Sequence, residues 1–454
     1  MNATVTRASF PRLRLSLMMF LQYAIWGAWL PLLWPYLSNH LKFSGADIGN
    51  AFALGALGSV FAPWIAGQVA DRYFNTERFL GLAHIAGGVL VWMLASVQTV
   101  EQFLWFSFLY SVVYSPTLPL TNSLALSHCD RDRDFGKVRL WGTVGWIVVG
   151  IAIGQWLLRV HTPGAEALAG LDGAAARAKV DAARFAGMAD AFKLSGALGV
   201  IMGVFCLLAL PSTPPQAGRR RSAIGEAIQQ VRLAPLVTLF MLAVPVSCIH
   251  QFYFVHTSGF VGGLQGGDGD AFSRAVNAVF GVGGGGLMTI GQMSEILVLG
   301  FIPALAATFS RKTLLAIGLA AYAARMFLFA YGPGMAAGAG MSPLTFVIPG
   351  IALHGLCFGC FIFVAFMIVD EQTTGDVRAS AQSLFNLVII GIGIIVGSKI
   401  ASAVSDITKV DGVQDYRAMF SVPMWGALFC LVMLLMFYLP GRTARSGEHS
   451  VSAG

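Results

Sequence analysis

Residues 344–369 read LTFVIPGIALHGLCFGCFIFVAFMIV, a run of 26 residues without a lysine, arginine, aspartate or glutamate. An α-helix rises about 1.5 Å per residue, so about twenty such residues cross the roughly 30 Å of hydrocarbon in a bilayer. This run therefore predicts a membrane-spanning helix.

Eleven more apolar blocks of similar length occur along the 454-residue chain. Of all residues, 56% are hydrophobic and only 11% are charged, whereas a soluble globular chain carries about a quarter charged residues. Strands of a membrane barrel would alternate apolar and polar residues, and these blocks do not. We therefore expect an all-α membrane protein with twelve transmembrane helices, at about 14–38, 47–70, 79–98, 102–126, 139–158, 192–210, 235–258, 285–309, 313–331, 344–369, 380–403 and 417–439.

A polar segment at 211–234, which contains Arg219, Arg220 and Arg221, divides the twelve blocks six plus six. Two six-helix bundles around a site near the bilayer midplane are typical of alternating-access transporters. The expected parts are an N-terminal bundle at 1–211, a basic cytoplasmic linker at 212–234, a C-terminal bundle at 235–439 and a cytoplasmic tail at 440–454.

Two segments between the blocks have unusual compositions. Residues 160–191 are rich in alanine interspersed with charges, which favours a short helix, so we expect an extracytoplasmic helical insertion there. Residues 262–286 are rich in glycine, which predicts a flexible linker or a mobile outer gate.

The net charge of +7 comes from basic residues at the ends of the apolar blocks. With both termini in the cytoplasm, the inside segments carry 18 of the 29 lysines and arginines, as the positive-inside rule requires. The basic residues therefore indicate topology, and we expect no nucleic-acid partner.

Glu295 is the one acidic residue that lies far from the end of a block. A carboxyl group near mid-bilayer is costly unless it faces a wet cavity or a partner, so it could take and lose a proton as a cavity opens and closes. The alternative is a buried structural acid that is paired with a cation or simply protonated. Gln292 lies one turn earlier on the same helical face, so both side chains can face one cavity.

Other polar residues occur inside the blocks. Arg139, Thr143 and Trp146 form a stripe of cation, hydroxyl and aromatic ring on the fifth block, which suits a polar ring-shaped solute. Arg139 could instead be an interface anchor, and a lone histidine is more often a packing residue. The remaining candidates are His250 and Tyr253 on the seventh block and His354 and Phe358 on the tenth, whereas Arg325 and His84 are expected to be structural.

Several short motifs run in order along the chain: Phe20-Leu21-Gln22, Trp26-Gly27, Trp29-Leu30, Leu41-Lys42-Phe43, Gly45-Ala46, Ile48-Gly49, Tyr114, Pro116-Thr117-Leu118, Arg139-Leu140-Trp141-Gly142-Thr143, Gln292 to Glu295, Leu328 to Gly332 and Arg378-Ala379-Ser380-Ala381-Gln382. A further motif, Gly67-x-x-x-Asp71-Arg72, resembles the loop signature of the major facilitator superfamily. Taken together, the short motifs resemble the nucleoside:proton symporters of that superfamily.

The resemblance implies a major facilitator fold and inward transport of nucleosides driven by the proton gradient. It places Arg139, Thr143, Trp146, Gln292, Glu295 and Phe358 at pocket positions. Three further pocket positions differ from the family, because His250, Tyr253 and His354 stand where it has glutamine, asparagine and tyrosine, and Gly359 replaces an aspartate. The ligand could therefore be another neutral polar solute, such as a sugar. A non-transporting receptor on the same scaffold is a third hypothesis, against which the unpaired Glu295 counts.

No metal-ligand spacing, phosphate-binding glycine loop or nucleophile elbow is present in the sequence. We therefore expect a transporter and not an enzyme, without a cofactor or metal. Its expected partners are a nucleoside-like solute, protons and the lipid bilayer. The family resemblance implies a monomer in the bacterial inner membrane.

Overall fold

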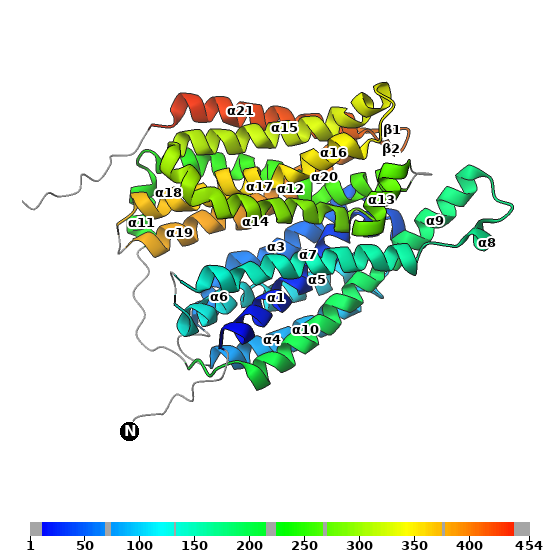
Figure 1. The fold of residues 1–454 in the computed structure, drawn as a ribbon. Coiled ribbons are helices and arrows are strands. Elements are labelled where there is room, and N and C mark those ends of the chain that lie inside the picture. The colour runs from blue at the N-terminus through cyan, green and yellow to red at the C-terminus, as the bar shows by residue number, and fades with distance from the viewer. Residues whose placement is uncertain are drawn as a thin grey trace, which may run out of the picture.

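The computed structural model describes residues 11–68, 74–130, 133–214, 224–266, 270–374 and 377–439, and these form an almost entirely helical molecule (Figure 1). The expected signature at Gly67 to Arg72, the run Arg219 to Arg221 and the tail at 440–454 lie wholly or largely outside the described residues.

The helices follow the apolar blocks closely. In the N-terminal half they are α1 (Pro11–Trp29), η1 (Leu30–Leu32), α2 (Leu33–Pro35), η2 (Tyr36–His40), α3 (Gly45–Gln68), α4 (Thr76–Leu94), α5 (Val100–Tyr114), α6 (Thr117–His128), α7 (Phe135–Arg159), α8 (Ala165–Leu168), α9 (Gly173–Gly187) and α10 (Ala189–Ala209). In the C-terminal half they are α11 (Ile224–Val231), α12 (Leu236–Gln265), α13 (Ala271–Phe280), α14 (Gly285–Thr308), α15 (Arg311–Gly338), α16 (Leu344–Ala352), α17 (His354–Leu356), η4 (Cys357–Phe363), α18 (Val364–Gln372), α19 (Arg378–Asn386), η5 (Leu387–Ile392), α20 (Gly393–Ile407) and α21 (Tyr416–Phe437).

Eleven helical segments in the described part of the chain are long and apolar enough to cross a membrane. The remaining expected block, 47–70, coincides with α3, and the side chains from residue 62 onward in α3 are not described. The expected class, a helical membrane protein, is confirmed. Among the described residues, eleven of the twelve expected spans meet the criterion of length and hydropathy.

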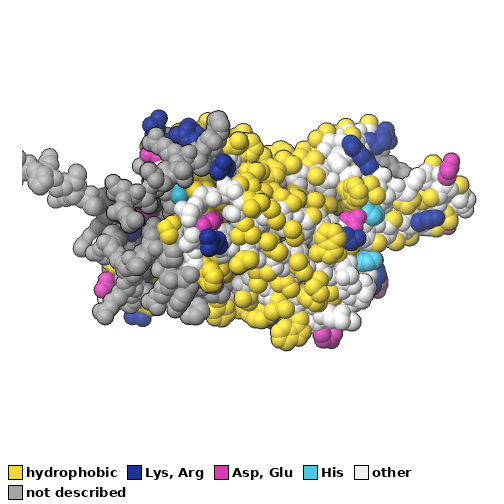
Figure 2. Space-filling view, turned by 90° about the horizontal axis from the view of Figure 1, so that it is seen from below, with side chains coloured by type: hydrophobic (Ala, Val, Ile, Leu, Met, Phe, Trp, Pro, Cys, Tyr) yellow, Lys and Arg dark blue, Asp and Glu magenta, His cyan; other side chains and the backbone are white. Residues whose placement is uncertain are grey.

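The lipid-facing surface is apolar, as a bilayer requires. Figure 2 shows a broad band of hydrophobic side chains on one face, with charged side chains gathered toward its ends. Large side chains such as Trp92, Trp105 and Leu208 are exposed by half or more. In water this surface would be an aggregation hazard, whereas in lipid it costs nothing.

Small residues let the helices of each half approach closely. A Cβ added at Gly88 of α4 would lie 2.8 Å from the carbonyl oxygen of Gly196 and 3.0 Å from the backbone nitrogen of Val200, both on α10. Such contacts between backbones replace the hydrophobic effect as the source of helix association in lipid.

Both ends of the described chain lie at one end of the molecule, where α1 begins and α21 ends (Figure 1). The opposite end carries α8, α9, α13 and a hairpin of β1 (Lys409–Val410) and β2 (Val413–Gln414), in which Val410 pairs with Val413. The hairpin turn is Asp411-Gly412, with φ of 50° and 78°, which matches the two positive φ values of a type I′ turn. We refer to this end, which lies opposite the two ends of the described chain, as the outer end of the molecule.

The alanine-rich segment at 160–191 contains α9, which is largely exposed and begins at a cap where Asp172 accepts a hydrogen bond from the Ala175 amide at 2.7 Å. The glycine-rich segment at 262–286 is not a plain flexible loop. It contains the ten-residue helix α13, because Asp270 caps its first turn and Gly281, with φ of 72°, ends it.

Candidate functional site

The nine residues predicted for the site lie on four of the apolar blocks. Arg139, Thr143 and Trp146 are on α7, in the N-terminal half. The other six belong to the C-terminal half: His250 and Tyr253 on α12, Gln292 and Glu295 on α14, His354 on α17 and Phe358 on η4. Since α7 and α14 pack side by side, these residues approach the boundary between the halves from both sides (Figure 1).

On the N-terminal side, Trp146 and Arg139 are held by aromatic rings of α1. Trp26 meets Trp146 edge to face at 5.7 Å between ring centroids, and the Arg139 guanidinium carbon lies 4.0 Å from the centre of the Tyr23 ring. Gly27 leaves room for this packing, because a Cβ there would lie 2.8 Å from the Trp146 ring. Trp146 also reaches Phe254 of α12 at 6.5 Å, so aromatic contacts join the two halves.

On the C-terminal side, the imidazole of His354 is the centre of an aromatic cluster. It stacks on Tyr253 at 4.8 Å and on His250 at 5.4 Å, and the Phe358 ring lies 6.4 Å away. The structure therefore brings together the three residues at which this sequence departs from the family pattern. Gly359, the fourth departure, faces Val298, since a Cβ there would lie 2.7 Å from a Val298 methyl group.

Glu295 lies next to this cluster. Its Oε2 is 3.6 Å from Nε2 of His354, and its side chain keeps 16% of its surface exposed. The Arg139 guanidinium, from the other half, acts on the same carboxylate electrostatically. Gln292, one turn earlier, is buried, and its Oε1 has no hydrogen-bond partner among the described residues. A carboxylate and an unpaired amide oxygen on one face of α14 can accept hydrogen bonds from a bound solute.

Arg325 of α15 was expected to be structural, yet it contacts the predicted site directly. It has no exposed surface, and its Nη1 lies 3.1 Å from Nδ1 of His354. The guanidinium also lies 4.4 Å from the centre of the Tyr253 ring and 4.9 Å from that of Tyr322. The sequence signal was available, since a charged residue in the middle of a span is expensive, but its neighbours were not apparent from the sequence.

The other contacts that the sequence missed involve ordinary residues of the apolar blocks. Tyr23, Trp26 and Phe254 surround the α7 residues, and the Tyr322 hydroxyl lies 2.7 Å from Nδ1 of His250. His84, also expected to be structural, is buried with its Nε2 2.8 Å from the Gln22 amide oxygen.

Backbone and amide contacts join the two halves at the outer end. The Val282 amide donates to the carbonyl oxygen of Gly154 at 3.0 Å. The Gln155 amide donates to the carbonyl oxygens of Asn277, Ala278 and Val279, at 3.4, 2.9 and 3.1 Å. A Cβ at Gly154 would collide with the carbonyl oxygen of Phe280, so this approach needs glycine.

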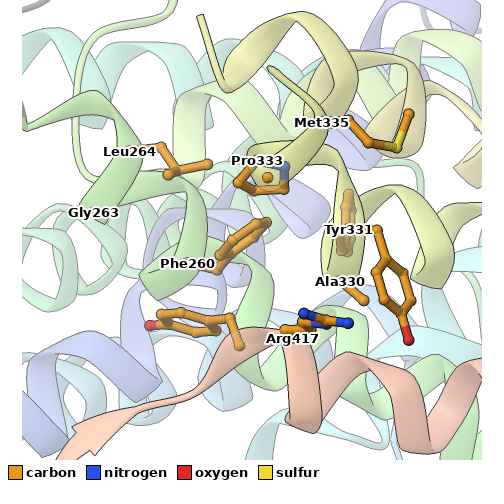
Figure 3. A pocket seen from close by; sticks show the side chains of 11 residues that line it. Phe260, Gly263, Leu264, Ala330, Tyr331, Pro333, Met335 and Arg417 are labelled. Atoms are coloured by element: carbon orange, nitrogen blue, oxygen red, sulfur yellow. The ribbon is translucent and has the colours of Figure 1, made fainter. Parts of the chain in front are cut away.

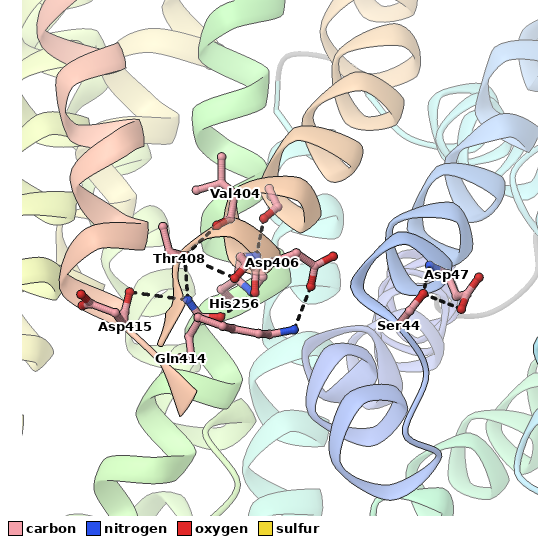
Figure 4. Close-up of polar contacts among 11 residues, drawn as sticks. Ser44, Asp47, His256, Val404, Asp406, Thr408, Gln414 and Asp415 are labelled. Atoms are coloured by element: carbon pink, nitrogen blue, oxygen red, sulfur yellow. Dashed lines mark hydrogen bonds and ion pairs between the residues drawn. The ribbon is translucent and has the colours of Figure 1, made fainter. Parts of the chain in front are cut away.

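A second outer contact joins α12 and α20 of the C-terminal half to α2 and α3. His256 meets the Trp34 ring at 4.2 Å, and its Nε2 lies 3.0 Å from the carbonyl oxygen of Ala401. Figure 4 shows the polar contacts that hold this region, including the Gln414 amide between Ser405 and Thr408. On the N-terminal half, Asn50 accepts a hydrogen bond from Lys399 at 3.0 Å.

A separate groove of about 620 Å³ lies between α12, α15 and α21 (Figure 3). Its lining is mostly apolar and includes Phe260, Phe329, Tyr331 and Arg417. None of the nine predicted residues lines it, so the groove is distinct from the site between the halves.

Comparison with known proteins decides the family. Residues 11–442 match the family described as Nucleoside H+ symporter. The chain belongs to the nucleoside H+ symporter family. This symporter is 28% identical to the putative nucleoside transporter YegT of Escherichia coli (strain K12), over 87% of this chain and 84% of that protein. It is 26% identical to the xanthosine permease of the same organism, over 93% and 94% of the two chains.

The fold of the symporter is similar to a solved one. A crystal structure of the nucleoside transporter NupG matches with a TM-score of 0.76 at 24% identity, covering 93% of this chain and 98% of that one. The expected major facilitator class and proton-coupled nucleoside transport are thereby confirmed, and the symporter is an integral membrane protein.

Proposed function

We propose that the chain imports nucleosides with protons across the bacterial inner membrane, that both of its termini are cytoplasmic, and that it works as a monomer without a cofactor. The position of Glu295 carries the proposal. This carboxylate has His354 of its own half on one side and is acted on by Arg139 of the other half. A proton added at Glu295 therefore changes the electrostatic interaction between the halves, which is what coupling needs.

The nucleoside would bind between α7 and the C-terminal cluster. Trp146 and Phe358 are only partly buried and could stack on the base, while Thr143, Gln292 and Glu295 could hydrogen-bond to its edge or to the ribose. The unpaired Gln292 Oε1 supports this arrangement, because a buried acceptor without a partner gains free energy when a ligand donates to it.

In the proposed cycle, protonated Glu295 and the bound nucleoside together stabilise an occluded form, and release to the cytoplasm lets the carboxyl lose its proton. The state described above is closed at its outer end, where Gly154, Gln155 and Trp34 contact the C-terminal half. The distribution of lysine and arginine supports cytoplasmic termini. A monomer suffices, because one chain supplies both sides of the site.

The test is uptake into proteoliposomes under an imposed inward proton gradient. The labelled panel contains uridine, adenosine, a free nucleobase, a hexose and a disaccharide, and empty liposomes are the control. We expect nucleosides to accumulate and the accumulation to collapse with a protonophore. Uptake of a sugar alone would show that His250, Tyr253 and His354 have changed the ligand. Binding of any solute without uptake would favour a receptor.

A further inference from the structure

The contact between Arg325 and His354 fixes the protonation pattern of the imidazole. A guanidinium has only donors, so at 3.1 Å the Arg325 Nη1 must donate and His354 Nδ1 must accept. A neutral imidazole carries one proton, which is then on Nε2. That atom is the one that lies 3.6 Å from Oε2 of Glu295.

We propose that Arg325 is a positioning residue for coupling: it keeps His354 as a neutral donor toward Glu295, so that His354 binds the ionised carboxylate and releases the protonated carboxyl. The Nε2–H attracts the ionised Glu295 carboxylate electrostatically across 3.6 Å. This nitrogen cannot accept the proton of a carboxylic acid, because its lone pair belongs to the aromatic system of the ring. Protonated Glu295 therefore turns its O–H to another acceptor, and the bound solute and the Gln292 Oε1 are nearby candidates.

The surroundings hold Arg325 in this role. It is fully buried, and the faces of Tyr253 and Tyr322 stabilise its charge. The second histidine, His250, receives its contact at Nδ1 from the Tyr322 hydroxyl at 2.7 Å, and Arg325 makes no hydrogen bond to it. Arg325 thus hydrogen-bonds to one imidazole of the stacked pair, although its charge acts on both.

The groups that face Glu295 come from four elements, and they set the sign of the expected effect. Arg139 faces it from α7, Tyr253 from α12 and His354 from α17, with Arg325 behind His354 on α15. In Arg325→Met the imidazole is free to move its proton to Nδ1. Nε2 then accepts from protonated Glu295, which favours the protonated form.

Arg325→Met should therefore raise the midpoint of the pH profile for nucleoside binding by about one pH unit, the shift expected when a close favourable interaction with the charged form of a group is lost. His84→Phe is the control, since it removes a buried histidine in the N-terminal half and should leave the midpoint unchanged. In a His354→Phe background, Arg325→Met should add no further shift. An equal shift with and without His354 would overturn the proposal, because Arg325 would then act through its field alone.

This inference rests on the role that the proposed function gives to Glu295. A second measurement, on the unaltered chain, does not depend on the proposed transport cycle. In protein labelled with ¹⁵N in the histidine rings, the resonances of His354 are assigned by their absence in His354→Gln. We expect a neutral Nε2–H imidazole from pH 5 to pH 8. An Nδ1–H tautomer or an imidazolium in this range would refute the inference even if Glu295 couples transport.

Discussion

Replacing Gln155 with leucine should open the outer end of the transporter. The Gln155 amide is on α7, and the carbonyl oxygens to which it donates belong to the last turn of α13, in the other half. The Asn277 carbonyl also accepts from the Gly281 amide at 2.8 Å, whereas Ala278 and Val279 belong to the last turn, where carbonyls lack an amide four residues on within the helix, so the Gln155 amide acts as a cap of α13. Any motion that separates the halves at this end breaks these bonds.

The size of the effect follows from the geometry. Two of the three contacts are short, at 2.9 and 3.1 Å, and each neutral hydrogen bond contributes about 0.5–1.5 kcal/mol net. Gln155 is half-buried, so water replaces part of what is lost. We expect Gln155→Leu to destabilise the outer-closed state by about 1–2 kcal/mol, which changes the ratio of the two states roughly 5- to 30-fold.

Electron spin–spin distance measurements can detect this change. Spin labels at Val160→Cys and Phe272→Cys, both exposed positions on opposite halves, report the outer separation. Of the six cysteines, five are buried, and Cys129→Ser removes the sixth, which is partly exposed and could otherwise take up the label. Gln155→Leu should add a population at longer distance, and Gln98→Leu, an exposed glutamine elsewhere in the N-terminal half, should not. An unchanged distribution in Gln155→Leu, or the same change in Gln98→Leu, would refute the reasoning.

Three further predictions concern the site and α13. Glu295→Gln, which mimics the protonated acid, should keep nucleoside exchange but lose accumulation driven by the proton gradient. Glu101→Gln, at an exposed position, is the control, and normal accumulation in Glu295→Gln would show that Glu295 does not couple transport to protons. Trp146→Ala should weaken nucleoside binding by about 1–3 kcal/mol if the indole stacks on the base, whereas Trp141→Ala, exposed on the same helix, should leave affinity measured by titration calorimetry unchanged. A hydrogen bond from the Ser273 amide lowers the pKa of Asp270. The ionised cap therefore stabilises α13 fully at pH values above the unfolded-state pKa of Asp270. This stabilisation is lost as the pH falls through the lower pKa of the folded state. Hydrogen exchange of α13, corrected for intrinsic rates, should therefore show protection declining on acidification in the native chain but not in Asp270→Asn; equal decline in both would contradict this role.

The sequence predicted the positions of the spans well because hydrophobicity is what places a helix in lipid. It was least accurate where glycines continue a helix. The seventh block was expected to end near 258, whereas α12 continues through the glycine-rich residues 259–265 to Gln265. Polar side chains hold these last turns: Ser258 donates to the Gly283 carbonyl oxygen at 3.0 Å and Gln265 to that of Gly281 at 2.9 Å. Hydrogen bonds to a distant loop cannot be read from local composition.

For the candidate site, the sequence identified residue types and depth but not neighbours. Glu295 and His354 were both singled out, and their 3.6 Å contact required the packing of α14 against α17. Arg325 was assigned a structural role because its helix was expected to lie away from the cavity. Its contact with His354 depends on the rotation of α15 about its axis, which an apolar helix surface does not specify.

The outer closure includes a contact between main-chain atoms of the two halves, and this lets substrate selectivity and part of the closure be engineered independently. The Gly154 carbonyl and the Val282 amide are the same whatever solute is carried. We expect a library that varies His250, Tyr253 and His354 of the proposed site to alter selectivity while leaving this main-chain contact at the outer end unchanged. Such a chain is a suitable starting scaffold for directed evolution toward new cargo, because a change of substrate need not be accompanied by a redesigned gate.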